Sequence, residues 1–66
     1  MRIILDGMEH EVPEGMTVLR LLEREGEPLH HALIELNGRH LPPHEYPLAI
    51  LQENDRVEVI LPAAGG

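Results

Sequence analysis

Short stretches of alternating hydrophobic and polar residues occur along the chain, and turn-forming residues separate them. Residues 2–6 and 8–12 are the first two stretches, and Asp6 and Gly7 join them as a pair typical of a two-residue hairpin turn. Residues 32–36 and 56–61 have the composition and length of two further strands. The pattern therefore predicts four β-strands, of which the first two form a hairpin.

A short helix is predicted between the second and the third strand. Thr17 is a suitable N-cap for a helix from residue 18 to about residue 25, and Gly26 is a suitable residue to end it. Three aliphatic side chains follow the helical spacing i, i+3 and i+4 and therefore share one face: Val18, Leu21 and Leu22. A helix this short needs a sheet to pack against.

Turn residues and prolines dominate the stretch between the third and the last strand. Asn37 and Gly38 form a second hairpin-type turn, and residues 41–47, with three prolines, are expected to be an edge or irregular segment. Residues 48–51 are predicted to form a short helical turn, and residues 54–55 a turn into the last strand. The order β-β-α-β-β predicts an α+β roll, in which a mixed sheet packs on one short helix.

Side-chain alternation divides the aliphatic residues between the two faces of the predicted sheet. Eight of them are expected on the helix side: Ile3, Leu5, Val12, Ala32, Ile34, Leu36, Val57 and Val59. Ile4, Leu33 and Ile60 are left for the opposite face, one from each of three strands. They predict an apolar patch on neighbouring strands that docks partner proteins. Scattered surface aliphatics are also normal in monomers, and that alternative stays open.

Composition limits the size of the protein and the nature of its core. The chain has 66 residues with no cysteine, tryptophan or phenylalanine and one tyrosine, so we expect one small domain with an aliphatic core and no disulfides. Its longest apolar run, residues 48–51, is too short to span a membrane, and its first residues do not resemble a signal peptide. A cytoplasmic location is therefore expected.

The charge balance indicates the kind of partner. The formal net charge is −7, all five basic residues are arginines, and there is no lysine. A protein of this sign repels nucleic-acid phosphates and anionic lipids, so neither nucleic acid nor membrane is an expected partner. A protein with a basic surface is a better candidate, although the charge also serves to keep a small domain soluble.

Catalytic and metal-binding residues are not evident in the sequence. The five histidines do not share a face at ligand spacing, because His30 and His31 are adjacent and two prolines separate His40 from His44. The chain has no cysteine or serine nucleophile, and Thr17 is assigned to a helix cap. We therefore expect neither a metal site nor an enzyme.

The last residues are the most specific chemical feature of the sequence. Residues 1–61 are predicted to form the folded domain, and Pro62 opens a flexible tail, residues 62–66, that ends in Gly65 and Gly66. Glycines without a Cβ atom suit a chain that enters a narrow active site. A carboxylate is a poor electrophile, so its reaction requires activation, for example by adenylation with ATP. The chain has no phosphate-binding loop, so a partner enzyme is expected to supply that step.

Several short motifs resemble, in their order and spacing, those of the ThiS family, the sulfur carriers of thiamine biosynthesis. The matching segments cover nearly the whole chain: Ile3-Ile4-Leu5-Asp6-Gly7, Val12-Pro13-Glu14-Gly15, Thr17-Val18, Asn37-Gly38, Leu41-Pro42, residues 51–59 and Gly65-Gly66. Three features depart from the pattern. Pro47 follows the usual aromatic, here Tyr46, Asn54 replaces a usual glycine, and residues 61–64 look more like the tail of MoaD, the related molybdopterin carrier.

The resemblance implies a ubiquitin-like β-grasp fold and a reaction cycle. A ThiF-like adenylyltransferase would use ATP to convert the carboxylate of Gly66 to an acyl-adenylate, and Gly65 would thread beside it. Sulfur from a persulfide donor would then give a thiocarboxylate, which donates sulfur to thiazole synthase. No cofactor is expected to bind the carrier itself.

Other functions are compatible with parts of the sequence. A MoaD-like carrier for molybdopterin, or a carrier for another thiolation pathway, would have the same tail. A ubiquitin-type protein modifier uses the same adenylation chemistry. A non-carrier β-grasp interaction module, in which the two terminal glycines are incidental, is the alternative from a different class.

Overall fold

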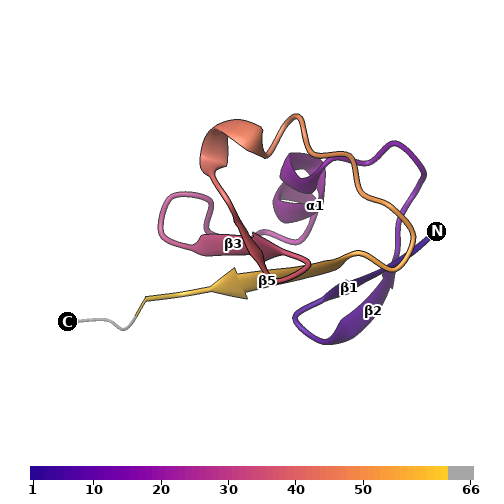
Figure 1. Cartoon of the computed structure of the whole chain (residues 1–66), viewed down its shortest axis with the longest axis horizontal. Coiled ribbons are helices and arrows are strands. Elements are labelled where there is room, and N and C mark those ends of the chain that lie inside the picture. The colour runs from indigo at the N-terminus through magenta and orange to yellow at the C-terminus, as the bar shows by residue number, and fades with distance from the viewer. Residues whose placement is uncertain (63–66) are drawn as a thin grey trace.

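The computed structural model describes residues 1–62 and contains a five-stranded mixed sheet with one α-helix on one side (Figure 1). The elements in chain order are β1 (Arg2–Leu5), β2 (Met8–Glu11), α1 (Val18–Arg24), β3 (Leu33–Leu36), β4 (Arg39–Leu41), the 3-10 helix η1 (Pro43–Glu45) and β5 (Arg56–Ile60). The strand order is β2-β1-β5-β3-β4. β1 and β5 are parallel, and the other neighbours are antiparallel. The predicted α+β class is confirmed.

The predicted hairpin turns form because their residues adopt positive φ angles. Asp6 and Gly7 have φ angles of 49° and 81°, and β1 pairs with β2 directly across them. Asn37 and Gly38 have φ angles of 53° and 81° and join β3 to β4 in the same way. Two consecutive positive φ angles match the right-handed twist of a two-residue hairpin, which explains why Asx-Gly pairs occupy both turns.

The predicted helix is confirmed together with both of its ends. The side-chain oxygen of Thr17 accepts a hydrogen bond from the backbone N–H of Arg20 (3.2 Å), as an N-cap does. At the other end Gly26 has a φ of 71°, and the N–H of Glu27 donates to the carbonyl of Leu22 (2.9 Å). This is the Schellman arrangement, in which a left-handed residue lets later N–H groups satisfy the last helical carbonyls.

The structure adds one strand to the predicted order β-β-α-β-β. β4 has three residues and is an edge strand that pairs with β3, with Leu41 opposite Ile34. Three residues followed by two prolines carry too little alternation to indicate a strand. The ladder exists because the turn at Asn37 brings the segment beside β3.

The predicted helical turn at residues 48–51 is wrong. The helical turn occurs earlier, in η1, where Pro43 occupies an N-terminal position that suits its fixed φ angle. The N–H of Tyr46 donates to the carbonyl of Pro43 (3.1 Å) and closes this turn. Ile50 is instead extended and forms an isolated antiparallel bridge with Thr17. The segment after η1 is therefore shaped by its contact with the start of α1.

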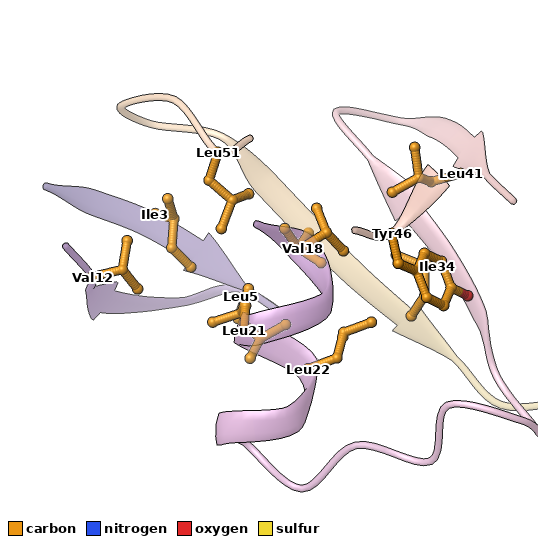
Figure 2. Packing of buried hydrophobic residues seen from close by; sticks show 11 residues of the cluster. Ile3, Leu5, Val12, Val18, Leu21, Leu22, Ile34, Leu41, Tyr46 and Leu51 are labelled. Carbon is orange, nitrogen blue, oxygen red and sulfur yellow. The ribbon is translucent and has the colours of Figure 1, made fainter. Parts of the chain in front are cut away.

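The core lies between α1 and the inner face of the sheet (Figure 2). Its buried residues are Ile3, Leu5, Val12, Val18, Leu21, Leu22, Ile34, Leu41, Tyr46, Leu51 and Val57. The eight residues expected on the helix side are all buried or packed against this cluster, so the predicted alternation is confirmed. Within residues 1–62, no helix has the length and apolar character needed to cross a membrane.

Candidate functional site

The candidate site is the end of β5 and the surface around it. Gly66, the predicted site of modification, and Gly65, the predicted threading residue, lie outside the described residues. β5 ends at Ile60 in the middle of the sheet order, and the side chains of Leu61 and Pro62 after it are exposed. Within the described residues, the sheet holds β5, the strand that leads to the predicted site.

β5 is held by β3 as far as its last residue, Ile60, and on the other side as far as Val59. On one side β3 pairs with it up to Leu33 opposite Ile60. On the other side β1 ends at Leu5, but the side chain of Asp6 continues the contact, because its Oδ1 accepts a hydrogen bond from the N–H of Val59 (2.9 Å). The backbone N–H of Asp6 also donates to the carbonyl of Val57 (2.9 Å). The two hydrogen bonds of Asp6 thus extend the sheet beyond the paired residues of β1.

The start of β5 is fixed by two Asx side chains from separate turns. Asn37 donates from Nδ2 to Oδ1 of Asp55 (2.9 Å) and accepts at its own Oδ1 from the N–H of Arg56 (2.9 Å). Oδ2 of Asp55 accepts from the N–H of Gln52 (2.7 Å). Sequence reasoning identified these residues only as turn formers and missed that their side chains anchor β5. A local signal was available for Asp55 alone, since Asp in turns commonly binds nearby backbone and Gln52 is three positions before it.

The predicted docking residues lie on three neighbouring strands, but they do not form one patch. Leu33 of β3 is directly opposite Ile60 of β5, with exposed fractions of 52% and 37%. Ile4 of β1 is half-buried and is level with Arg56. Arg56 lies four positions before Ile60 along β5, a separation of about 13 Å at the rise of a strand. Leu33 and Ile60 therefore form a pair near the end of β5, and Ile4 lies apart from it.

Ile4 lines a shallow hollow on the same side of the molecule. The hollow has a volume of about 440 Å³ and is also lined by Asp6, Arg56 and Glu58. It lies beside residues 56–58 of β5, and its lining includes Ile4 but neither Leu33 nor Ile60. The docking role assigned to Ile4, Leu33 and Ile60 stays a prediction.

One pair of carboxylates adjoins the apolar pair on the outer face of the sheet, the face opposite α1. Glu35 of β3 is directly opposite Glu58 of β5, one pair of residues from Leu33 and Ile60 on the same face. Arg2, on the same face, is engaged by the side chains of Glu9 and Asn54. The surface around the end of β5 is therefore both apolar and acidic.

The histidines are distributed over the surface. His10 has its Nδ1 atom 3.9 Å from a carboxylate oxygen of Glu25, and His30, His31, His40 and His44 are exposed. Among residues 1–62, no three His, Asp or Glu side chains gather in a group that could hold a metal ion.

Comparisons with known proteins bear on the whole chain. The model of the ThiS family matches residues 2–66. A crystal structure of the thiamine biosynthesis protein ThiS from Geobacter metallireducens has a TM-score of 0.86 at 25% identity and covers 100% of both chains. An NMR solution structure of a thiamine biosynthesis protein from the same organism has a TM-score of 0.77 at 25% identity, covering 100% of this chain and 88% of that one. No curated protein matches the chain. The predicted ubiquitin-like β-grasp fold is confirmed by these structures together with the mixed sheet and single helix described above.

Proposed function

The chain belongs to the ThiS family, a family of small carrier proteins, and from this premise we propose that it carries sulfur on the C-terminal carboxyl group of Gly66. The observation that carries the proposal is the extent of the family match. It includes Gly65 and Gly66 as well as the folded domain. In this proposal the protein is a substrate of other enzymes, and its own residues present the tail.

The proposed chemistry begins with activation of the carboxylate. A ThiF-like adenylyltransferase transfers AMP from ATP to the carboxylate of Gly66 and releases pyrophosphate. The terminal sulfur of a persulfide donor then attacks the acyl carbon, and AMP leaves. A thiol then attacks the donor's sulfur in the resulting S–S bond and forms a disulfide with the donor, and the thiocarboxylate of Gly66 is released as the leaving group. ATP and the persulfide are thus used by the partners and are not bound as cofactors of the carrier.

The proposed acceptor of the sulfur is thiazole synthase, in the thiamine pathway and in the cytoplasm. The name of the Geobacter metallireducens relative supports this choice, because it is a thiamine biosynthesis protein similar to this chain over its full length. The sulfur atom of a thiazole ring needs a nucleophilic sulfur source, and a thiocarboxylate supplies one.

The geometry around β5 supports the presentation of a reactive tail. Hydrogen bonds from β3 on one side and from Asp6 on the other hold β5 up to its last residues. Because the end of β5 is held in place, the residues that follow it start at a fixed position relative to the proposed docking residues. Leu33 and Ile60 are the proposed docking contacts nearest to the end of β5, and Ile4 is a more distant one.

Intact-mass measurement tests the proposal. The protein is incubated with ATP, a ThiF-like adenylyltransferase and a persulfide sulfur donor. We expect a mass gain equal to the replacement of one oxygen atom by sulfur, and none when ATP is omitted. A variant that lacks Gly66 should gain no mass, while the wild-type protein in the same assay serves as the control for enzyme activity.

Transfer to the acceptor needs a separate measurement. The thiocarboxylate form is mixed with thiazole synthase and its other substrates, and loss of the added sulfur mass is followed with time. Retention of the sulfur with thiazole synthase but release to another acceptor would contradict the proposed pathway. No sulfur gain with active adenylyltransferase would contradict the carrier function itself.

A further inference from the structure

Asn37 and Gly38 form the only Asn-Gly pair in the sequence. In such a pair the backbone nitrogen of the glycine attacks the side-chain carbonyl carbon of the asparagine, because no Cβ atom on the glycine hinders the approach. The new N–C bond closes a succinimide ring, a base takes the proton from the glycine nitrogen, and the side-chain nitrogen leaves as ammonia. Water then opens the ring to aspartate or isoaspartate. Both residues are exposed, so water and hydroxide reach the pair.

The side-chain amide of Asn37 uses both its nitrogen and its oxygen to hold the start of β5. Its Nδ2 donates to Oδ1 of Asp55, and its Oδ1 accepts from the N–H of Arg56, both at 2.9 Å. The backbone N–H of Asn37 also donates to the carbonyl of Arg56 (2.7 Å). A carboxylate has no hydrogen to donate, so an aspartate at this position would lose the contact with Asp55. The nitrogen that deamidation removes is therefore one that the fold uses.

The same contacts restrain the reaction in the folded protein. Attack requires the side chain of Asn37 to rotate toward the nitrogen of Gly38, whereas the hydrogen bonds to Asp55 and Arg56 hold it toward β5. Both hydrogen bonds must break first. The turn leads into β4, an edge strand of three residues, and short edge elements open locally at a small cost in free energy. We therefore expect the reaction to proceed through local opening of the β3–β4 hairpin, without unfolding of the core.

We infer that Asn37 is a site of spontaneous deamidation, and that the carboxylate formed there releases the start of β5. An aspartate at residue 37 places its charge against Asp55 across a contact that held a hydrogen bond, and like charges at that spacing repel. Isoaspartate also lengthens the backbone by one carbon atom, which disrupts a two-residue turn. β5 leads to the proposed site at Gly66, so the modification acts on the strand that precedes that site.

The end of β5 is held independently of Asn37, because Oδ1 of Asp6 accepts from the N–H of Val59 (2.9 Å). Two arginines are close to Asn37 in the sheet register, Arg39 in β4 and Arg56 in β5, and both are exposed. Ion pairs at exposed sites contribute little, so neither arginine should restore the anchor after deamidation. The expected change is therefore local, at the start of β5 and not at its end.

The first experiment locates the modification and measures its rate on the whole protein. Samples are kept at mildly alkaline pH, folded in buffer or unfolded in urea, and mass spectrometry of the intact protein and its peptides follows the replacement of an amide NH2 by OH. We expect conversion at Asn37 in both samples, at least about tenfold slower in the folded one. Asn54, the other asparagine, precedes Asp55 and should convert far more slowly in urea. In urea Gly38→Ala should slow conversion at least about tenfold, because its methyl group hinders the attack.

The second experiment tests the effect on β5 with defined variants. We expect Asn37→Asp to lower the melting temperature by about 10 °C, measured by circular dichroism, and to speed hydrogen exchange more at the Arg56 amide than at the Val59 amide. The control combines Asn37→Asp with Asp55→Asn, which returns one amide and one carboxylate to the pair. The amide at residue 55 then donates to the carboxylate at residue 37, and its oxygen still accepts from the N–H of Gln52. Most of the lost melting temperature should therefore return.

Several results would overturn the proposed modification or its effect. If the folded protein stays unconverted for a period that converts the unfolded chain completely, Asn37 is not a site in the native protein. Equal rates in the two samples would show that the contacts with Asp55 and Arg56 do not restrain the reaction. A melting temperature of Asn37→Asp equal to that of the wild type, or no recovery in the double variant, would overturn the release of β5. None of these measurements involves sulfur, so their outcomes are independent of the carrier function.

Discussion

At the scale of single residues, Asp6 links the first turn of the chain to the last strand. Its φ of 49° forms the turn, and its side chain accepts from the N–H of Val59 where β1 has no residue left to do so. Asp and Asn tolerate this conformation better than other non-glycine residues. One residue therefore shapes a hairpin and holds the strand that leads to the proposed site.

Substitution of Asp6 separates its two roles. We expect Asp6→Ala to lower the free energy of unfolding by about 1–2 kcal/mol, because it removes the acceptor for Val59 and strains the turn. Asp6→Asn keeps an oxygen acceptor and tolerates the positive φ, so its loss should be less than about 0.5 kcal/mol. Urea unfolding measures both variants, and hydrogen exchange at the Val59 amide reports the local contact. Equal losses in the two variants would show that the negative charge, and not the acceptor, is what matters.

Tyr46 provides a second test at this scale. It is buried in the core, and burial raises the pKa of its phenol above the ordinary value near 10. The unfolded chain therefore loses this proton at a lower pH than the folded protein does. Stability should fall as the pH rises above about 10, until the pH exceeds the folded pKa.

The composition makes this alkaline effect easy to assign. The chain has no lysine or cysteine and one tyrosine, so no other side chain titrates between about pH 9 and about pH 11. We expect Tyr46→Phe to abolish most of the fall in unfolding free energy over this range, as measured by urea unfolding at several pH values. A fall of the same size in Tyr46→Phe would place its origin in another group.

At the scale of secondary-structure elements, the sequence predicted the turns and helix ends that depend on neighbouring residues alone. The hairpin turns at Asp6 and Asn37 and the helix ends at Thr17 and Gly26 depend on φ preferences and caps within a few residues, and all four were predicted. β4 and the bridge of Ile50 were not predicted, because each exists through pairing with another segment and not through its own residue pattern. The contacts of Asn37 with Asp55 and Arg56, which anchor β5, were missed for the same reason.

Substitution of Gly38, in the turn between β3 and β4, tests whether glycine is needed there only for its backbone conformation. Gly38 has a φ of 81°, and a Cβ atom there would meet no atom within 4 Å. Gly38→Ala should therefore cost only the backbone strain, about 1–2 kcal/mol of unfolding free energy. Gly38→Asn should cost less, because asparagine enters this region more readily. Thermal melting compares the two, and an equal cost would point to a steric cause that the structure does not contain.

At the scale of the whole molecule, the two ends of the folded domain meet in the centre of the sheet. β1 and β5 are parallel neighbours, so the first strand supports the strand that precedes the proposed site. The sequence predicted the face on which Ile4, Leu33 and Ile60 lie, because alternation fixes it. Their distances from one another depend on strand register, which alternation does not specify.

That register leads to a prediction about how the three residues act in binding. Leu33 and Ile60 are in contact positions across two strands, so their contributions to docking on the adenylyltransferase should be coupled. Ile4 is level with Arg56, about 13 Å along the strand from Ile60, so it should contribute independently. We expect a coupling energy of about 0.5–1 kcal/mol between Leu33→Ala and Ile60→Ala, and less than about 0.3 kcal/mol between Ile4→Ala and Leu33→Ala.

Double-mutant cycles on the binding constant, measured by titration calorimetry, determine both couplings. Circular dichroism melting of each variant is the control. Truncation of the exposed side chains Leu33 and Ile60 should change the melting temperature little, whereas Ile4, being half-buried, should lower it more. Strong coupling of Ile4 with Leu33 would mean that the partner contacts the face as one continuous surface. Independent effects of Leu33 and Ile60 would mean that the enzyme does not bind the pair as a unit. Other residues would then form the contact near the end of β5.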